Sequence, residues 1–210
     1  MAYHHPVFAR LYSRLSPAME RSGMGEHRDH LLAGLTGLVV EVGAGDGANF
    51  PHYPAGVERV VAVEPEPYLR GRASERAARL PVAINVVDAV AERLPLPDAS
   101  FDAGVVSLAL CSVRDPHAAL QELHRVIRPG GELRFFEHVR SRSPAMRQVQ
   151  RVLDASVWPV LAGGCHSGRD TAAAIATAGF AIENMRSIRF PDIPLPTPVS
   201  EHIDGVARRP

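Results

Sequence analysis

The sequence contains no lysine, so all 23 of its basic side chains are arginines. This absence excludes any mechanism that needs a lysine nucleophile, a lysine Schiff base or the lysine of a phosphate-binding loop. Acidic residues also number 23, which makes the formal net charge zero. The balance of charge therefore gives no reason to expect a nucleic acid or an anionic membrane as partner.

Cysteine is also scarce, because the chain has only Cys111 and Cys165. Two cysteines are too few for a disulfide framework, and their wide separation, without a histidine at close spacing, predicts no metal site. No apolar run approaches the roughly 20 residues that span a bilayer, and we recognise no signal peptide. We expect a cytoplasmic protein without stable membrane insertion. At 210 residues the chain predicts a single domain.

A glycine-rich turn is the most informative stretch. The apolar run 38–42 leads into a turn with glycine at every second position, Gly43, Gly45 and Gly47. Glycine lacks a Cβ, so it allows positive φ angles and lets a ligand approach the main chain closely. Such a turn also occurs between any strand and helix, and the glycines alone leave both interpretations open.

Strand-like and helix-like segments alternate along the first two thirds of the chain. The expected strands are the β-branched or apolar runs 38–42, 58–63, 82–87, 101–110 and 132–137, with further strands at 180–188 and 202–207. This alternation is typical of an open parallel sheet covered by helices on both faces. The carboxyl ends of its strands then share one edge, where such sheets bind ligands.

Acidic residues follow two successive strands at that edge. Glu64 comes about twenty residues after the glycine turn, where a carboxylate accepts hydrogen bonds from ribose hydroxyls. This alone would fit NAD. Three features oppose an NAD-dependent oxidoreductase. The glycines follow Glu41 with the spacing Gly-x-Gly-x-Gly, and a second acid, Asp88, ends the third expected strand. The chain also has no lysine, and no tyrosine after Tyr68, that could form a Tyr/Lys hydride-transfer site.

Five motifs in order then resemble the class I S-adenosylmethionine (SAM) dependent methyltransferases. They are Glu-Val-Gly-Ala-Gly-Asp-Gly, Glu64, Asp88-Ala89, Leu-Pro-Leu-Pro-Asp-Ala-Ser-Phe-Asp and Leu-His-Arg-Val-Ile-Arg-Pro-Gly-Gly, within residues 38–138. The resemblance implies a Rossmann-like α/β fold with a mostly parallel seven-stranded sheet and SAM as cofactor, with S-adenosylhomocysteine as its product. It implies that the three glycines line the methionine end, Glu41 lies under the amino group, Glu64 holds the ribose, Asp88 meets the adenine and Leu108 lies near the sulfonium. The cofactor residues it implies are Glu41, Gly43, Ala44, Gly45, Gly47, Asn49, Phe50, Glu64, Pro65, Asp88, Ala89, Val90, Ser107, Leu108 and Cys111.

A narrower resemblance extends from Val42 to Ala207. Five further motifs are similar to those of the methyltransferase-like alkyl thiol methyltransferases of animal endoplasmic reticulum and lipid droplets. They are Ala-Asn-Phe-x-x-Tyr-Pro, Leu-Cys-Ser-Val, Phe-x-Glu-His-Val, Gly-Cys-x-x-x-Arg-x-Thr and His-Ile-x-Gly-x-Ala. That family has a hydrophobic membrane anchor at its N-terminus, where this chain has the arginine-containing segment 6–15. Residues 98–131 also resemble ubiquinone and menaquinone C-methyltransferases.

The chain divides into three expected parts around this core. Residues 1–36 are a helical lid or lead-in, 37–138 the SAM-binding core, and 139–210 an acceptor-side part. Helical spacing of apolar residues predicts a helix over 6–15, and Ser16-Pro17 is expected to end it and start another. Tyr3, His4 and His5 could close over a ligand, but we expect them to be disordered, as terminal residues commonly are.

Two histidines are candidates for a general base. His138 follows the fifth expected strand, and His166 lies in a glycine-rich loop. Each could instead have only a structural or surface role. Cys111 could face the sulfonium or be a small buried thiol, and Glu137 is expected to pair with Arg169 or Arg140. The expected substrate pocket comprises Phe8, Tyr12, Trp158 and Arg169.

The sequence thus predicts a SAM-dependent methyltransferase that acts on a small molecule, with a thiol as the favoured acceptor. O- or C-methylation of a phenol, a quinone or another metabolite is the alternative, and a non-catalytic SAM-binding module is a remote one. The intact set of glycines and acids opposes the last. The oligomeric state is not predicted.

Overall fold

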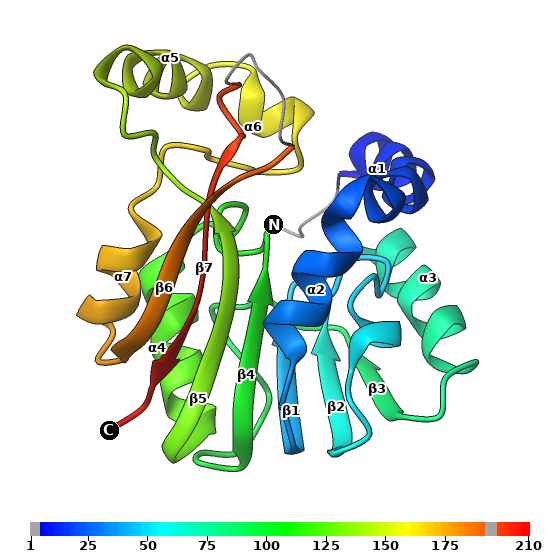
Figure 1. Ribbon diagram of the computed structural model, residues 1–210. Coiled ribbons are helices and arrows are strands. Elements are labelled where there is room, and N and C mark those ends of the chain that lie inside the picture. The colour runs from blue at the N-terminus through cyan, green and yellow to red at the C-terminus, as the bar shows by residue number, and fades with distance from the viewer. Residues whose placement is uncertain (1–4, 192–196) are drawn as a thin grey trace.

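A computed structural model describes residues 5–191 and 197–210 of the chain. Tyr3 and His4 therefore lie outside the described residues. A seven-stranded sheet in the order β3-β2-β1-β4-β5-β7-β6 forms the centre (Figure 1). Its strands are β1 (Gly37–Val42), β2 (Val57–Val63), β3 (Ala83–Val87), β4 (Phe101–Ser107), β5 (Ile127–His138), β6 (Ala181–Arg189) and β7 (Glu201–Arg208).

The strand directions confirm the predicted fold class. β3, β2, β1, β4 and β5 pair in parallel, whereas β7 runs antiparallel to both β5 and β6. The chain moves outward from β1 to β3 and then returns to place β4 on the other side of β1. This reversal opens a crevice at the carboxyl ends of β1 and β4, where doubly wound sheets bind ligands.

Helices cover both faces of the sheet. They are α1 (Pro6–Met19), α2 (Gly25–Leu32), α3 (Pro67–Ala77), α4 (Pro116–Val126), α5 (Pro144–Asp154), α6 (Trp158–Leu161) and α7 (Thr171–Thr177), with a π-helical turn η1 (Glu20–Met24) and a 3-10 turn η2 (Phe50–His52). At the starts of α3, α4, α5 and α7, the side chain of the N-cap residue accepts a hydrogen bond from a free backbone N–H group. The Asp115 carboxylate, for example, accepts from His117 and Ala118 at the start of α4.

Successive residues of β1 belong to two separate cores. Val40 packs with Leu120 and Leu123 of α4 on one face of the sheet. Val39 packs with Leu31 and Leu32 of α2 on the other face. Because neighbouring side chains of a strand point to opposite faces, a continuous apolar run is what a strand buried on both sides requires.

The N-terminal helix differs from the prediction. Ser16-Pro17 does not end it, since α1 continues through Pro17 to Met19. The break comes later, within η1, where Gly23 takes a φ of 109°. Ala9 and Ser16 are buried on the inner face of α1, and this packing outweighs the backbone hydrogen bond that proline cannot donate. Among the described helices, none combines the length and apolar character needed to cross a membrane.

Candidate active site

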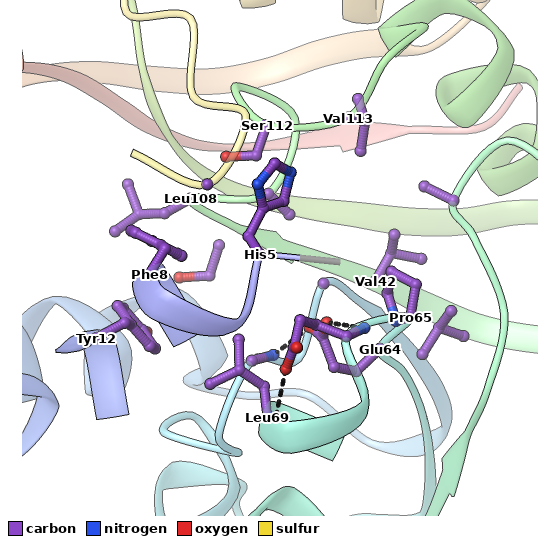
Figure 2. Close-up of a pocket in the computed structure, with 18 residues that line it drawn as sticks. His5, Phe8, Tyr12, Val42, Glu64, Pro65, Leu69, Leu108, Ser112 and Val113 are labelled. Atoms are coloured by element: carbon purple, nitrogen blue, oxygen red, sulfur yellow. Dashed lines mark hydrogen bonds between the residues drawn. The ribbon is translucent and has the colours of Figure 1, made fainter. Parts of the chain in front are cut away.

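A cavity of about 160 Å³ lies at the carboxyl edge of the sheet, covered by α1 (Figure 2). Residues at the ends of β1, β2 and β4 form its floor, and the start of α1 closes it from above. The lining residues are His5, Phe8, Tyr12, Val42, Gly43, Gly45, Val63, Glu64, Pro65, Glu66, Leu69, Ala91, Ser107, Leu108, Ala109, Ser112, Val113 and Gly163. The predicted ligand edge is therefore the edge that carries the cavity.

Two of the three turn glycines line this cavity. Gly43 and Gly45 have φ angles of 74° and 57°, which a residue with a Cβ rarely adopts. A Cβ added at Gly43 would lie 2.5 Å from the Cβ of Ala109, across the crevice. Gly47 does not line the cavity, and a Cβ there would meet the buried ring of Phe50 at 2.6 Å. Gly43 thus keeps the crevice open, a Cβ at Gly45 would make only an ordinary contact of 3.5 Å with Tyr12, and Gly47 serves core packing.

Glu64 is buried beside the turn. The backbone N–H groups of Gly45 and Glu66 each donate to its carboxylate at 2.8 Å. Burial raises the pKa of Glu64, and these two hydrogen bonds oppose the rise. The carboxylate is fixed in place and is a strong acceptor on the cavity wall. This arrangement suits a ligand with hydroxyl groups.

Glu41 lies beneath the cavity and does not line it. Its carboxylate accepts hydrogen bonds from the Asn49 amide and the Tyr53 hydroxyl, each at 2.8 Å. Complete burial raises the pKa of Glu41 to about 7, against the effect of both hydrogen bonds. Arg28 binds the other end of the Asn49 amide. Glu41 therefore anchors the base of the glycine turn, and the contact with an amino group that the resemblance implies stays a prediction.

The second strand-end acid is more exposed than its predicted role suggests. The side chain of Asp88 is 68% exposed and pairs with Arg70 at 2.9 Å. Neither Asp88 nor its neighbours Ala89 and Val90 line the cavity, although Ala91 does. The contact of Asp88 with adenine stays a prediction that would require the ligand to extend beyond the described cavity.

The loop after β4 carries the opposite wall. Leu108 has a φ of 57°, which is costly for a residue with a Cβ, and it lines the cavity beside Ser107. The Glu137 carboxylate accepts from the backbone N–H groups of Ala109, Leu110 and Cys111. The described contacts thus give Glu137 these backbone donors as partners, whereas Arg140 pairs with Asp170. The expected Glu137 pairing with Arg169 or Arg140 is wrong, because Glu137 is buried directly under the loop it holds.

The roof of the cavity comes from the N-terminal segment. Phe8 and Tyr12, two of the residues predicted for the substrate pocket, line this cavity, and the centroids of their stacked rings lie 5.8 Å apart. His5 also lines it, contrary to the expected disorder. One turn of α1 separates Phe8 from Tyr12, so both project from one helix face. His5, the residue immediately before α1, reaches the same space, as Figure 2 shows.

The remaining predicted residues lie outside the described lining. Trp158, Phe50 and Ala44 do not reach the cavity, and Arg169 instead donates to the backbone carbonyls of Leu110 and Val113. Sequence reasoning missed Ser112, Val113 and Gly163, although Gly163 belongs to the glycine-rich loop it had noted. Leu69 and Glu66 also escaped it, because only the orientation of α3 brings them to the cavity.

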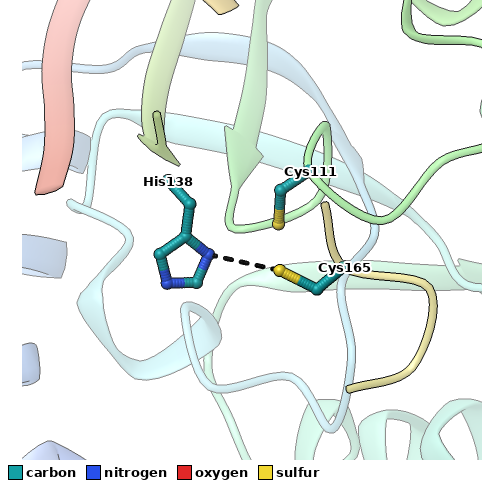
Figure 3. Close-up of side chains that lie close together, drawn as sticks. All are labelled: Cys111, His138 and Cys165. Atoms are coloured by element: carbon teal, nitrogen blue, oxygen red, sulfur yellow. Dashed lines mark hydrogen bonds between the residues drawn. The ribbon is translucent and has the colours of Figure 1, made fainter. Parts of the chain in front are cut away.

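His138 and His166 do not line the cavity either. The Nδ1 atom of His138 lies 3.7 Å from the Cys165 Sγ, and His166 Nδ1 lies 2.7 Å from the carbonyl oxygen of Gly164. Cys111 completes a cluster with His138 and Cys165 (Figure 3). The two cysteines were predicted to form no metal site because they lie far apart in the sequence. The fold nevertheless brings both of them next to His138. The assignment of either histidine as a base stays a prediction.

The residues present fit the cofactor that the motifs predict. At Gly43 an added Cβ would block the crevice, and the fixed carboxylate of Glu64 lies beside the glycine turn. The apolar side chains of Leu69 and Ala91 line the same cavity. The glycine main chain would leave room for the methionine part, Glu64 would hold the ribose, and the apolar wall would take a flat ring. All of these residues lie at the strand ends nearest the topological reversal.

Comparison with known proteins agrees with this geometry. Residues 40–135 match a family described as a methyltransferase domain. The human thiol S-methyltransferase TMT1B is 33% identical over 210 residues, covering 95% of this chain and 85% of the relative.

Solved structures share the fold. A SAM-dependent methyltransferase of Thermotoga maritima superposes with a TM-score of 0.71 at 20% identity, covering 97% of each chain. The geranyl diphosphate C-methyltransferase of Streptomyces coelicolor, solved with S-adenosylhomocysteine, gives 0.70 at 14% identity over 95% of this chain and 83% of its own. With identity of this extent to TMT1B, the chain belongs to the same family and is a class I SAM-dependent methyltransferase.

Proposed function

We propose that this enzyme transfers the methyl group of SAM to the sulfur of a small thiol. The observation that carries the proposal is the similarity to human TMT1B, a thiol S-methyltransferase, over 95% of the chain. The cavity supports it, since apolar side chains from α1 and from the loop after β4 lie on its wall, namely Phe8, Leu108 and Val113. Such a wall suits an uncharged, partly apolar acceptor.

The chemistry asks little of the protein beyond positioning. Methyl transfer from a sulfonium is an in-line displacement, so holding acceptor and methyl together and excluding water supplies most of the rate enhancement. A thiol with an ordinary pKa of about 8.5 loses its proton far more readily than an alcohol. A site with few ionisable groups near the acceptor therefore suits S-methylation.

His5 is our candidate for the group that takes the thiol proton. It is the one histidine among the described residues that lines the cavity. His138 and His166 remain the candidates from the sequence. If replacing both with glutamine left the pH dependence of turnover unchanged, that assignment would be removed.

His5→Gln tests the assignment directly. We expect kcat/KM to fall by about a hundredfold below the pKa of the acceptor thiol, as for other general bases. The loss should disappear above that pKa, where the thiolate forms without help. An equal loss at every pH would instead indicate that His5 only positions the acceptor.

We also propose a separate role for each of three segments of the chain. Residues 1–36 act as a lid, supported by the place of His5, Phe8 and Tyr12 on the cavity roof. Residues 37–138 hold the cofactor. Residues 139–210 complete the acceptor side, supported by Gly163, whose Cβ position would lie 2.4 Å from the Phe8 ring.

A radiolabelled methyl-transfer screen tests the acceptor class. Purified enzyme would be given labelled SAM with alkyl and aryl thiols, phenols, quinones and amines in parallel. We expect labelled thioethers. Labelled phenol ethers or quinones without labelled thioethers would overturn the thiol assignment, and binding of S-adenosylhomocysteine without any transfer would favour a non-catalytic role.

A further inference from the structure

Three potential metal ligands from distant parts of the chain converge behind the cavity wall. Cys111 follows β4, His138 ends β5, and Cys165 lies in the loop after α6. Their donor atoms all lie within 4.8 Å of one another, and Cys165 Sγ is 3.7 Å from His138 Nδ1. Figure 3 shows both sulfurs beside the imidazole. Both cysteines are buried and free.

We propose that Cys111, His138 and Cys165 bind a zinc ion. Two thiolates and an imidazole are a donor set that zinc prefers, and three protein ligands leave one tetrahedral position for a water or another ligand. Zinc–sulfur bonds of about 2.3 Å and zinc–nitrogen bonds of about 2.0 Å set tetrahedral donors roughly 3.5 to 3.8 Å apart. The sulfur–nitrogen distance of 3.7 Å already meets this requirement.

The backbone holds the two cysteine loops together independently of any ion. The N–H of His166 donates to the carbonyl oxygen of Cys111 at 2.7 Å. Arg169 reaches across from the second loop to the carbonyls of Leu110 and Val113. Glu137 fixes the first loop from below through the N–H of Cys111. The ligand atoms are therefore brought together by the fold, which lowers the entropic cost of binding an ion.

Charge balance and surroundings favour a cation over a disulfide. Two thiolates and a neutral imidazole around Zn²⁺ carry no net charge, which a buried site tolerates. Binding releases the proton of each thiol to solvent. The buried indole Nε1 of Trp158 has no hydrogen-bond partner among the described residues, and it lies near the Cys165 thiol. A metal-bound thiolate at Cys165 would give this N–H group an acceptor. A disulfide between Cys111 and Cys165 would not involve His138, whereas a metal ion would use all three side chains.

The site adjoins the cavity but does not line it. Ser112, next to Cys111, and Gly163, two residues before Cys165, both lie on the cavity wall. A bound ion would therefore fasten the C-terminal part of the chain to the strand ends that form the cavity. This inference does not depend on which acceptor the enzyme methylates.

Titration of the reduced, full-length protein with Cd²⁺ and Zn²⁺ under anaerobic conditions tests the proposal. We expect stoichiometric Cd²⁺ binding with thiolate-to-metal charge-transfer absorption, displacement by Zn²⁺, and a higher unfolding temperature with Zn²⁺. C111S and C165S should each reduce the charge-transfer band. H138Q, which preserves both thiols, should weaken binding by at least about tenfold.

The matched control is H117Q, an exposed histidine of α4 whose ring contacts Gln121. It should bind both metals as the unaltered protein does. Absence of a charge-transfer band in the folded, reduced protein would overturn the proposal, as would equal affinities of H138Q and H117Q. Mass spectrometry of anaerobically purified protein that found Cys111 and Cys165 joined as a disulfide would also overturn it. None of these readouts requires methyl transfer.

Discussion

The backbone N–H of Gly45 donates a 2.8 Å hydrogen bond to the carboxylate of Glu64. This contact joins the glycine turn after β1 to the strand-end acid after β2. The two features that the sequence predicts to contact the methionine and ribose parts of one cofactor are thus joined in one unit. A change in either residue should disturb the position of the other.

Glu64→Gln should lower the affinity for S-adenosylhomocysteine by about tenfold or more, because an amide nitrogen would face one of the two backbone donors. Isothermal titration calorimetry measures this. Glu75→Gln is the control, since Glu75 is exposed and pairs only with Arg72 among the described contacts. Equal affinities of the two variants would contradict the role of Glu64.

Gly43→Ala should destabilise the fold and impair cofactor binding together. The left-handed φ costs an alanine roughly 1 to 2 kcal/mol, and the clash with Ala109 adds roughly 1 to 3 kcal/mol. Gly34→Ala is a matched control, because Gly34 has a φ of 76° but no atom within 4 Å of an added Cβ. Urea unfolding of both variants separates strain from clash. A Gly43→Ala variant no less stable than Gly34→Ala would refute the close approach across the crevice.

Phe8→Ala should raise the KM for the acceptor by roughly tenfold while leaving S-adenosylhomocysteine affinity nearly unchanged, because it opens the roof of the cavity. Its neighbour Val7 is 81% exposed on the outer face of α1, so Val7→Ala serves as the control. Steady-state kinetics with a saturating cofactor measures the difference. Matching KM values for the two variants would show that α1 is no part of the acceptor site.

Glu41 should make stability depend on pH. Its pKa rises from an ordinary value of 4.5 to about 7 in the folded protein. Between these values the folded state retains a proton that the unfolded state has lost. The contribution is therefore fully present below pH 4.5 and is lost as the pH rises through about 7. The total is on the order of 3 kcal/mol.

Glu41→Gln removes this titration, so its free energy of unfolding should vary less between pH of about 4.5 and about 8 than that of the unaltered protein. Urea unfolding across this range provides the measurement. Glu58→Gln, an exposed change on β2, should keep the original slope. A slope unchanged by Glu41→Gln would mean that other groups cause the dependence.

Some parts of the protein follow from local sequence. The glycine turn requires positive φ angles at Gly43 and Gly45, and β-branched runs define buried strands on either side of it. Glu64 falls at a strand end by spacing alone. Because parallel strands align their carboxyl ends, these local features sufficed to predict the fold and the cofactor edge.

Tertiary structure decided the rest. His5 reaches the cavity roof because α1 packs over the edge of the sheet. Cys165 lies near Cys111 because the loop after α6 packs against the same edge. No periodicity or short spacing encodes such contacts, because they join segments far apart in the chain whose positions are set by packing. For the same reason the sequence could propose His138 as a base, while only the fold showed that its ring faces Cys165.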